Sequence, residues 1–326
     1  IMGTIGATFF LIGVGLLYSL TGTLNIADLA VKLPEVDATR TLHTAFAFIV
    51  AGVGLKLALY PVHLWLPNAY TYAPSAVSAF IAATATKVAV YVLLRVLFTV
   101  FGASYSFNHM PLAPILMGLS VIGIIATSIM ALNQVDAKRL LAYSSVAQIG
   151  YMVVGLAFIS TAGVTASVTH VFNHALMKGA MFLALGAVAY RVGSTRISDI
   201  EGLGKAMPWT MSAFAIGGLS LIGIPLTAGF ISKWYLILAI LERGWWVLAL
   251  IVLATSLIAV MYVWKIVEAA WFRPLPERNA DVTEAPLGLL VPVWLLTAAN
   301  IWFGIDTRWS VGIASRAADM LLGVTP

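Results

Sequence analysis

Four lysines stand inside long apolar stretches of this chain: Lys56, Lys87, Lys178 and Lys233. A charged lysine at the centre of a membrane helix costs roughly 2.5–3.5 kcal/mol, so an ionisable residue in such a position usually has a function. A buried lysine also binds or releases its proton when neighbouring charges move. These lysines therefore predict a path that carries protons.

Two histidines extend this pattern, because His170, His174 and Lys178 are spaced four residues apart and would share one face of a helix. Imidazole titrates near neutral pH and has two nitrogens, so a row of histidines can pass a proton along. Two alternatives remain open, a haem or metal pair and histidines that serve packing. Two ligands on one helix face suit a single iron poorly, and we therefore favour the proton relay.

The composition excludes a water-soluble enzyme. Of 326 residues, 61% are apolar and 10% are charged, against about 25% charged in a typical soluble protein. The chain has no cysteine and so offers no thiolate for an iron–sulfur cluster, c-type haem or disulfide. Its net charge of +5 is spread thinly, which suits loops between membrane spans better than nucleic acid. No nucleotide-binding fingerprint is present, and we expect no cofactor.

Nine stretches are long and apolar enough to cross a bilayer as helices. They are too long for the alternating strands of a barrel. The sequence therefore predicts an all-α polytopic membrane protein with about nine transmembrane helices. The predicted spans are residues 3–21, 41–66, 75–100, 112–132, 139–159, 162–190, 209–241, 245–264 and 286–304.

The loops predict an orientation. Eight Lys and Arg residues fall in loops on the side of residue 1, against five or six on the other side. Because short cytoplasmic loops carry the excess of basic residues, we expect residue 1 on the cytoplasmic side and the C-terminus outside.

Two of the spans contain helix breakers near mid-depth, Pro61 in 41–66 and Pro225 in 209–241. Proline removes a backbone hydrogen bond, and in lipid the freed carbonyl group needs another partner. An ordinary kink is one interpretation. The two spans are five helices apart, however, which inverts one relative to the other, and such a pair indicates a transport site near the midplane.

The carboxylates are distributed differently, because no Asp or Glu falls in the middle of a predicted span. Lys56 therefore lacks an evident counter-ion. Lys265 and Glu268, three residues apart at a helix end, are expected to form a solvated pair. The chain also opens at Ile1 directly into an apolar stretch, which favours a fragment of a longer protein.

Four stretches together resemble a known family, the proton-translocating antiporter-like subunits shared by Mrp-type sodium/proton antiporters and respiratory complex I (the L-, M- and N-type membrane subunits of NADH-quinone oxidoreductase). They are Gly54–Pro74, Asp136–Tyr151, His170–Lys178 and Gly223–Lys233. The segments Leu17–Leu29 and Thr71–Pro74 look more like the D-type subunit of Mrp antiporters than the complex I subunits.

The resemblance implies a fold of about fourteen helices with two inverted five-helix repeats, each containing a broken helix. Residues 1–305 would form a single transmembrane domain that matches helices six to fourteen, followed by a C-terminal tail at 306–326. About five N-terminal helices would be missing, and the first repeat would be incomplete. Lys56 resembles the lysine of the first broken helix, which the family pairs with a glutamate on helix five, and Lys87 resembles the residue that links the two half-channels.

In the second repeat, His170, His174 and Lys178 match the family's relay, and Lys233 matches the lysine of the second broken helix. The expected function is a subunit that moves protons, in exchange for Na+ in the Mrp case, together with other membrane subunits in a bacterial inner membrane. The alternative within the family is a proton-pumping subunit of an NADH-quinone oxidoreductase. In that case the chain would belong to an enzyme whose redox centres lie on other subunits. The alternative of another class is a haem- or quinone-binding membrane subunit.

Overall fold

The computed structural model describes residues 2–324, in which the regular elements are helices and one isolated backbone bridge joins Asp136 to Arg196. The helices are α1 (Met2–Thr21), α2 (Ile26–Lys32), α3 (Arg40–Leu57), α4 (Trp65–Tyr72), α5 (Ser75–Leu94), α6 (Gly102–Ser104), α7 (Leu112–Leu132), α8 (Ala137–Ala157), α9 (Thr161–Val192), α10 (Leu203–Ala206), α11 (Pro208–Ile222), α12 (Ala228–Glu242), α13 (Trp246–Phe272), α14 (Leu287–Ile305) and α15 (Arg308–Leu322). Short π-helical turns (Arg95–Val100, Tyr105–His109) flank α6, and 3-10 turns lie at Leu33–Glu35, Ile197–Asp199 and Glu277–Asn279.

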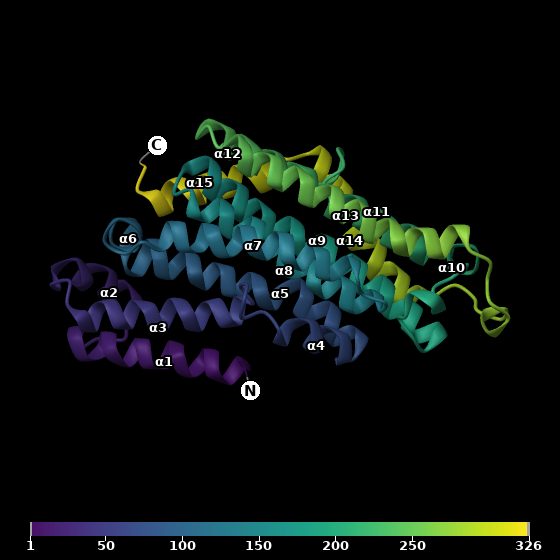
Figure 1. The fold of residues 1–326 in the computed structure, drawn as a ribbon, viewed down its shortest axis with the longest axis horizontal. Helices are drawn as coiled ribbons and strands as arrows, with labels where there is room; N and C mark the ends of the chain where they lie inside the picture. The colour runs from purple at the N-terminus through teal and green to yellow at the C-terminus, as the bar shows by residue number, and fades with distance from the viewer. Residues whose placement is uncertain (1, 325–326) are drawn as a thin grey trace.

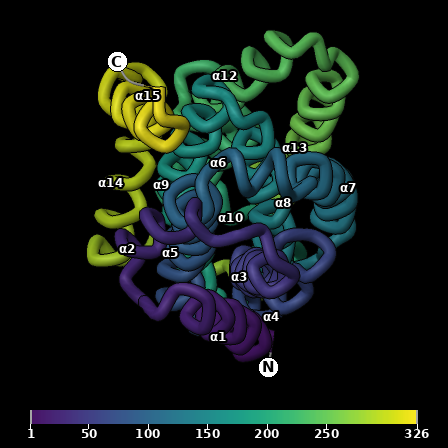
Figure 2. The backbone as a smooth tube through the Cα atoms, turned by 90° about the vertical axis from the view of Figure 1, so that its left-hand side faces the viewer, coloured from purple at the N-terminus to yellow at the C-terminus, as the bar shows by residue number. Residues whose placement is uncertain are grey.

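The long helices run roughly parallel and form one bundle (Figure 1). The centre is occupied by α9, which packs against α5, α8, α11, α12, α14 and α15. Seen along the bundle, α14 and α15 lie on one side and α7 on the other (Figure 2). Nearly every residue of α8 is buried, so this helix has no face toward the surroundings.

The outer faces of the peripheral helices are apolar. Leu250, Leu257 and Leu295, for example, are 64%, 68% and 66% exposed, as expected where the solvent is lipid. Within residues 2–324, seven helical segments are long and apolar enough to cross a membrane. They match seven of the nine predicted spans, and the other two are the spans with predicted breaks.

Both predicted breaks are present. The chain leaves the helix around Pro61, between α3 and α4, and around Pro225, between α11 and α12. Each first half ends on a residue with left-handed backbone, Ala58 (φ 61°) and Gly223 (φ 94°). Glycine adopts this conformation without the steric cost that a Cβ imposes.

Carbonyl groups at the two breaks accept hydrogen bonds from different side chains. At the end of α3, the indole Nε1 of Trp65 donates to the carbonyl oxygen of Leu55 at 2.8 Å. At the end of α11, the ammonium of Lys233 donates to the carbonyl oxygens of Leu221 (3.0 Å) and Ile222 (2.9 Å). One break is therefore completed by a neutral donor and the other by a cation.

The loop before α14 fixes the start of α11. The carboxylate of Glu284 accepts from the backbone N–H of Trp209 (2.7 Å) and from the hydroxyl of Thr210 (2.6 Å). A carboxylate at this position satisfies free N–H groups and interacts well with the positive end of the helix.

The predicted pairing of Lys265 with Glu268 is wrong. Lys265 donates instead to the carbonyl oxygens of Leu132 and Gln134 (3.1 and 2.8 Å) at the end of α7, while Glu268 binds Arg273 at 3.0 Å. The last carbonyl groups of a helix lack partners within it, and a long lysine side chain from a neighbouring helix can donate hydrogen bonds to them.

The described part of the predicted C-terminal tail contains α15, which packs against α9 with Ala314 and Ala318 buried. At the start of α15, the guanidinium of Arg308 forms hydrogen bonds with Asp306 and lowers the pKa of Asp306 to about 2. Asp306 is therefore ionised at any physiological pH.

Close packing of α8 on α9 depends on two glycines. A Cβ at Gly155 would lie 2.7 Å from the carbonyl oxygen of Gly163, and one at Gly163 would lie 2.5 Å from that of Gly155. We predict that Gly155→Ala forces the helices apart and lowers the free energy of unfolding by about 1–3 kcal/mol. Thermal unfolding in detergent measures this change.

The matched control is Gly118→Ala on α7, where a Cβ meets nothing within 4 Å. This variant should unfold at or slightly above the original temperature, because alanine favours a helix interior over glycine. Equal melting temperatures for the two variants would contradict the proposed role of the α8–α9 contact.

Candidate functional site

Five of the six predicted proton-carrying residues are buried, with Lys87 at 6% exposure, Lys233 at 5%, and the remaining three at 2% or less: His170, His174 and Lys178. They come from α5, α9 and α12. Lys56 differs, because its side chain is exposed and forms no hydrogen bond or ion pair within residues 2–324. Its predicted role is thus not explained by contacts in this part of the chain.

The three predicted residues of α9 lie in one row, as their spacing requires. The rings of His170 and His174 are stacked, with centroids 5.9 Å apart and planes inclined by 15°. Further along, the ammonium of Lys178 donates to the carbonyl oxygen of Leu141 at 2.9 Å and to the hydroxyl of Ser144. Both partners are on α8, so the α8–α9 contact positions this lysine.

His170 uses both of its ring nitrogens. Nε2 lies 2.9 Å from the side-chain oxygen of Gln148, and Nδ1 lies 2.7 Å from the hydroxyl of Ser232. An amide oxygen can only accept, so Nε2 donates to Gln148, while Nδ1 pairs with the hydroxyl of Ser232. His170 is thereby connected to α8 on one side and to α12 on the other.

His174 is the central member of the group. It is fully buried, and neither ring nitrogen has a hydrogen-bond partner within the described residues. Lys178 follows it by four residues on the same face of α9, and Lys87 lies on α5, which packs against α9. Lys87 itself donates to the carbonyl oxygen of Ala82 and the hydroxyl of Thr86 on its own helix.

Lys233 ends the group at the second helix break. Its ammonium donates to the two carbonyl groups at the end of α11 and to the hydroxyl of Ser256 on α13 at 3.0 Å. The ammonium also lies 5.0 Å from the centre of the Tyr151 ring. The negative end of the α11 dipole favours a cation at this position.

Sequence reasoning did not assign Ser144, Gln148 and Tyr151 a role, although the structure places all three beside the predicted residues. Their spacing of four and three residues puts them on one face of α8, and that polar stripe was the available signal. His63, buried and stacked on Tyr60 at 5.2 Å, was also missed.

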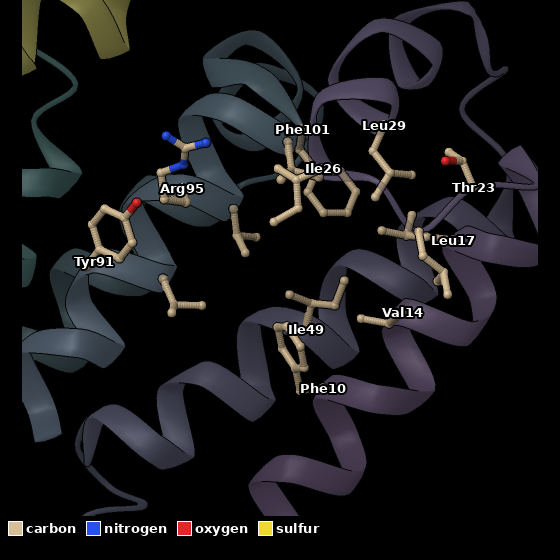
Figure 3. A pocket seen from close by; sticks show the side chains of 14 residues that line it. Phe10, Val14, Leu17, Thr23, Ile26, Leu29, Ile49, Tyr91, Arg95 and Phe101 are labelled. Atoms are coloured by element: carbon tan, nitrogen blue, oxygen red, sulfur yellow. The ribbon is translucent and has the colours of Figure 1, made fainter.

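The two histidines do not fit the haem alternative. Both ring nitrogens of His170 already bind protein groups, Gln148 and Ser232, so neither is free to bind an iron. An apolar cavity of about 420 Å³ lies elsewhere, between α1, α3 and α5, with Arg95 and Tyr91 on one wall (Figure 3). None of the predicted proton carriers lines it.

The family profile described as NADH:quinone oxidoreductase/Mrp antiporter, transmembrane, matches residues 1–259. The chain belongs to this family. The relatives include the N-type subunit of the NADH-quinone oxidoreductase of Desulforudis audaxviator, which is 43% identical over 317 residues, covering 94% of this chain and 63% of that protein. The D-type subunit of the Na+/H+ antiporter of Alkalihalophilus pseudofirmus is 32% identical over 326 residues, covering all of this chain and 65% of that protein.

Among solved structures, the fold is similar to that of a chain in the Mrp complex of a Dietzia species. The TM-score is 0.88 at 25% identity, covering 99% of this chain and 67% of that one. These findings confirm the predicted all-helical fold, and the chain is an integral membrane protein. It spans a little under two thirds of the two curated relatives, and its identity is higher with the oxidoreductase subunit than with the antiporter subunit.

The burial of Lys178 gives a prediction about stability. Its ammonium has three hydrogens and two protein partners, and it is completely buried. A buried charge without a counter-ion is costly, and an apolar side chain of similar length removes that cost. We therefore expect Lys178→Met to raise the melting temperature in detergent.

Lys265→Met is the control with the opposite sign. That substitution leaves the two carbonyl groups at the end of α7 without their donor and should lower the melting temperature. If Lys178→Met were as destabilising as Lys265→Met, Lys178 would serve the fold and its burial would need no functional explanation.

Proposed function

We propose that this chain is part of an ion-translocating membrane subunit that moves protons along Lys87, Lys178, His174, His170 and Lys233. The observation that carries the proposal is the set of neutral partners around these groups. Carbonyl oxygens, hydroxyls and one amide contact them, and within residues 2–324 no carboxylate forms an ion pair with Lys87, Lys178 or Lys233.

Neutral partners leave each proton mobile. A carboxylate beside an ammonium would hold its proton firmly, whereas carbonyl and hydroxyl oxygens stabilise the charge without fixing it. Like charges in a poorly screened interior also repel one another. A proton arriving at Lys87 therefore disfavours one on Lys178 or His174, and the repulsion drives the next step.

In this scheme His174 is the exchange point, because its free ring nitrogens can bind water from either direction. Lys87 would link this half of the subunit to the first half, and Lys233 would control transfer to one side of the membrane. Lys56 would act as the switching lysine of the first half. Pro61 and Pro225 would keep the backbone open so that water reaches the line of carriers.

The setting of this activity follows from the loop charges. We infer a bacterial inner membrane with residue 1 on the cytoplasmic side. The orientation rests on the larger number of basic loop residues on the side of residue 1. Moving one charge against 100 mV requires about 2.3 kcal/mol. Partner subunits must supply it, through a sodium gradient or through a redox reaction.

The carriers can be tested directly. Lys233→Ala and Lys56→Ala should each abolish ion-coupled proton flux in liposomes that contain the complete subunit with its partners. Membrane insertion should persist, because removing a buried charge eases insertion. Lys205→Ala, an exposed lysine on α10, should leave flux unchanged. Flux that survived both of the first substitutions would refute the proposed line.

The redox-driven alternative within the family is favoured by the 43% identity to an N-type subunit of NADH-quinone oxidoreductase. The two assemblies differ in what drives the flux. Vesicles that hold a sodium/proton antiporter should move protons when a sodium gradient is imposed. Vesicles that hold a redox pump should move them when NADH and a short-chain quinone are added.

A further inference from the structure

The ammonium of Lys233 has an unusual shell. Its three hydrogens are accounted for by Leu221, Ile222 and Ser256 at 2.9–3.0 Å. The remaining side is covered by the ring of Tyr151, whose centre is 5.0 Å from the nitrogen. The face of an aromatic ring carries negative charge density and attracts a cation, most strongly where water is excluded.

Tyr151 is itself held in place on α8. Its hydroxyl forms a 2.8 Å hydrogen bond with Thr255, the residue next to Ser256 on α13. Two neighbouring residues of α13 therefore fix the ring and the ammonium that faces it. The ring also contacts His170 edge to face, with centroids 6.2 Å apart and planes at 82°. Tyr151 thus stands at the junction between the α9 row and the second break.

We propose that Tyr151 is the positioning residue that takes the place of a carboxylate counter-ion for Lys233. The inference deepens the proposed function and rests on it. The face of the ring stabilises the charged ammonium beside His170, and because the ring has no full charge of its own, the proton can still leave. Ser232 precedes Lys233 in α12 and binds Nδ1 of His170. Its hydroxyl therefore offers a path for a proton between His170 and Lys233.

The test compares the ring with the hydroxyl. Tyr151→Phe keeps the aromatic face and loses the bond to Thr255, whereas Tyr151→Leu loses both. In liposomes containing the complete subunit with its partners, we expect the leucine variant to lose proton flux about tenfold or more. The phenylalanine variant should stay within about threefold of the original protein, because the cation–π contact persists.

Phe46→Leu is the matched control for loss of a buried ring. Phe46 is 1% exposed on α3, packs edge to face against Phe101 and Tyr105, and has no cation over its face within the described residues. The Phe46→Leu variant should lower the melting temperature about as much as Tyr151→Leu does, and it should leave the proton flux per assembled complex unchanged.

Three results would overturn the inference. Tyr151→Phe could lose as much flux as Tyr151→Leu, which would make the hydroxyl the active group. Tyr151→Leu could keep its flux, or Phe46→Leu could lose as much as Tyr151→Leu. Lys233→Ala in the same assay distinguishes failure of the proposed function from failure of the role of Tyr151. Persistent flux in Lys233→Ala refutes the proposed function. Loss of flux in Lys233→Ala with retention in Tyr151→Leu removes only the role of Tyr151.

Discussion

The burial of ammonium groups without carboxylates is the constraint on which the rest of this structure depends. A lysine inside a membrane protein needs hydrogen-bond acceptors, because desolvation of its charge is otherwise prohibitive. Here the acceptors are backbone carbonyl and hydroxyl oxygens. The break between α11 and α12 leaves the carbonyl groups of Leu221 and Ile222 without partners in the helix, and Lys233 donates to both of them. The helix break therefore provides the acceptors that the buried lysine needs, and the lysine provides the donors that the carbonyl groups at the break need.

The same constraint accounts for the central pair of helices. Lys178 and His170 on α9 find their acceptors on α8, at Ser144 and Gln148. Such bonds need the two backbones close together, and the contact between Gly155 and Gly163 permits this approach. Because α8 supplies polar groups on one side and packing surface on the others, it is buried all round. The proposed relay and the close α8–α9 packing coincide for this reason.

The two helix breaks are alike in backbone and differ in chemistry. At the first, Trp65 donates to the carbonyl oxygen of Leu55, and Lys56 projects outward, exposed, on the side of α1. At the second, a lysine satisfies the carbonyl groups and is enclosed by α8 and α13. Within the described residues, the buried members of the proposed line therefore lie in the second half and at its link through Lys87. The family to which the chain belongs includes both sodium/proton antiporters and redox-driven complexes, and a line of carriers built on neutral partners suits either source of energy.

The sequence by itself determined the class of fold, the positions of both breaks and most of the ionisable residues that are buried together. Those properties depend on local features, namely long apolar runs, prolines within them, and lysines and histidines at helical spacing, and each can be recognised in one segment. The tertiary structure decided which groups the buried and charged side chains contact. Lys265 binds the end of α7 rather than Glu268, and Tyr151 covers Lys233 from a helix about eighty residues earlier in the chain. A single segment indicates which face of a helix is polar, but which helix meets that face, and at what height, depends on the packing of the whole bundle.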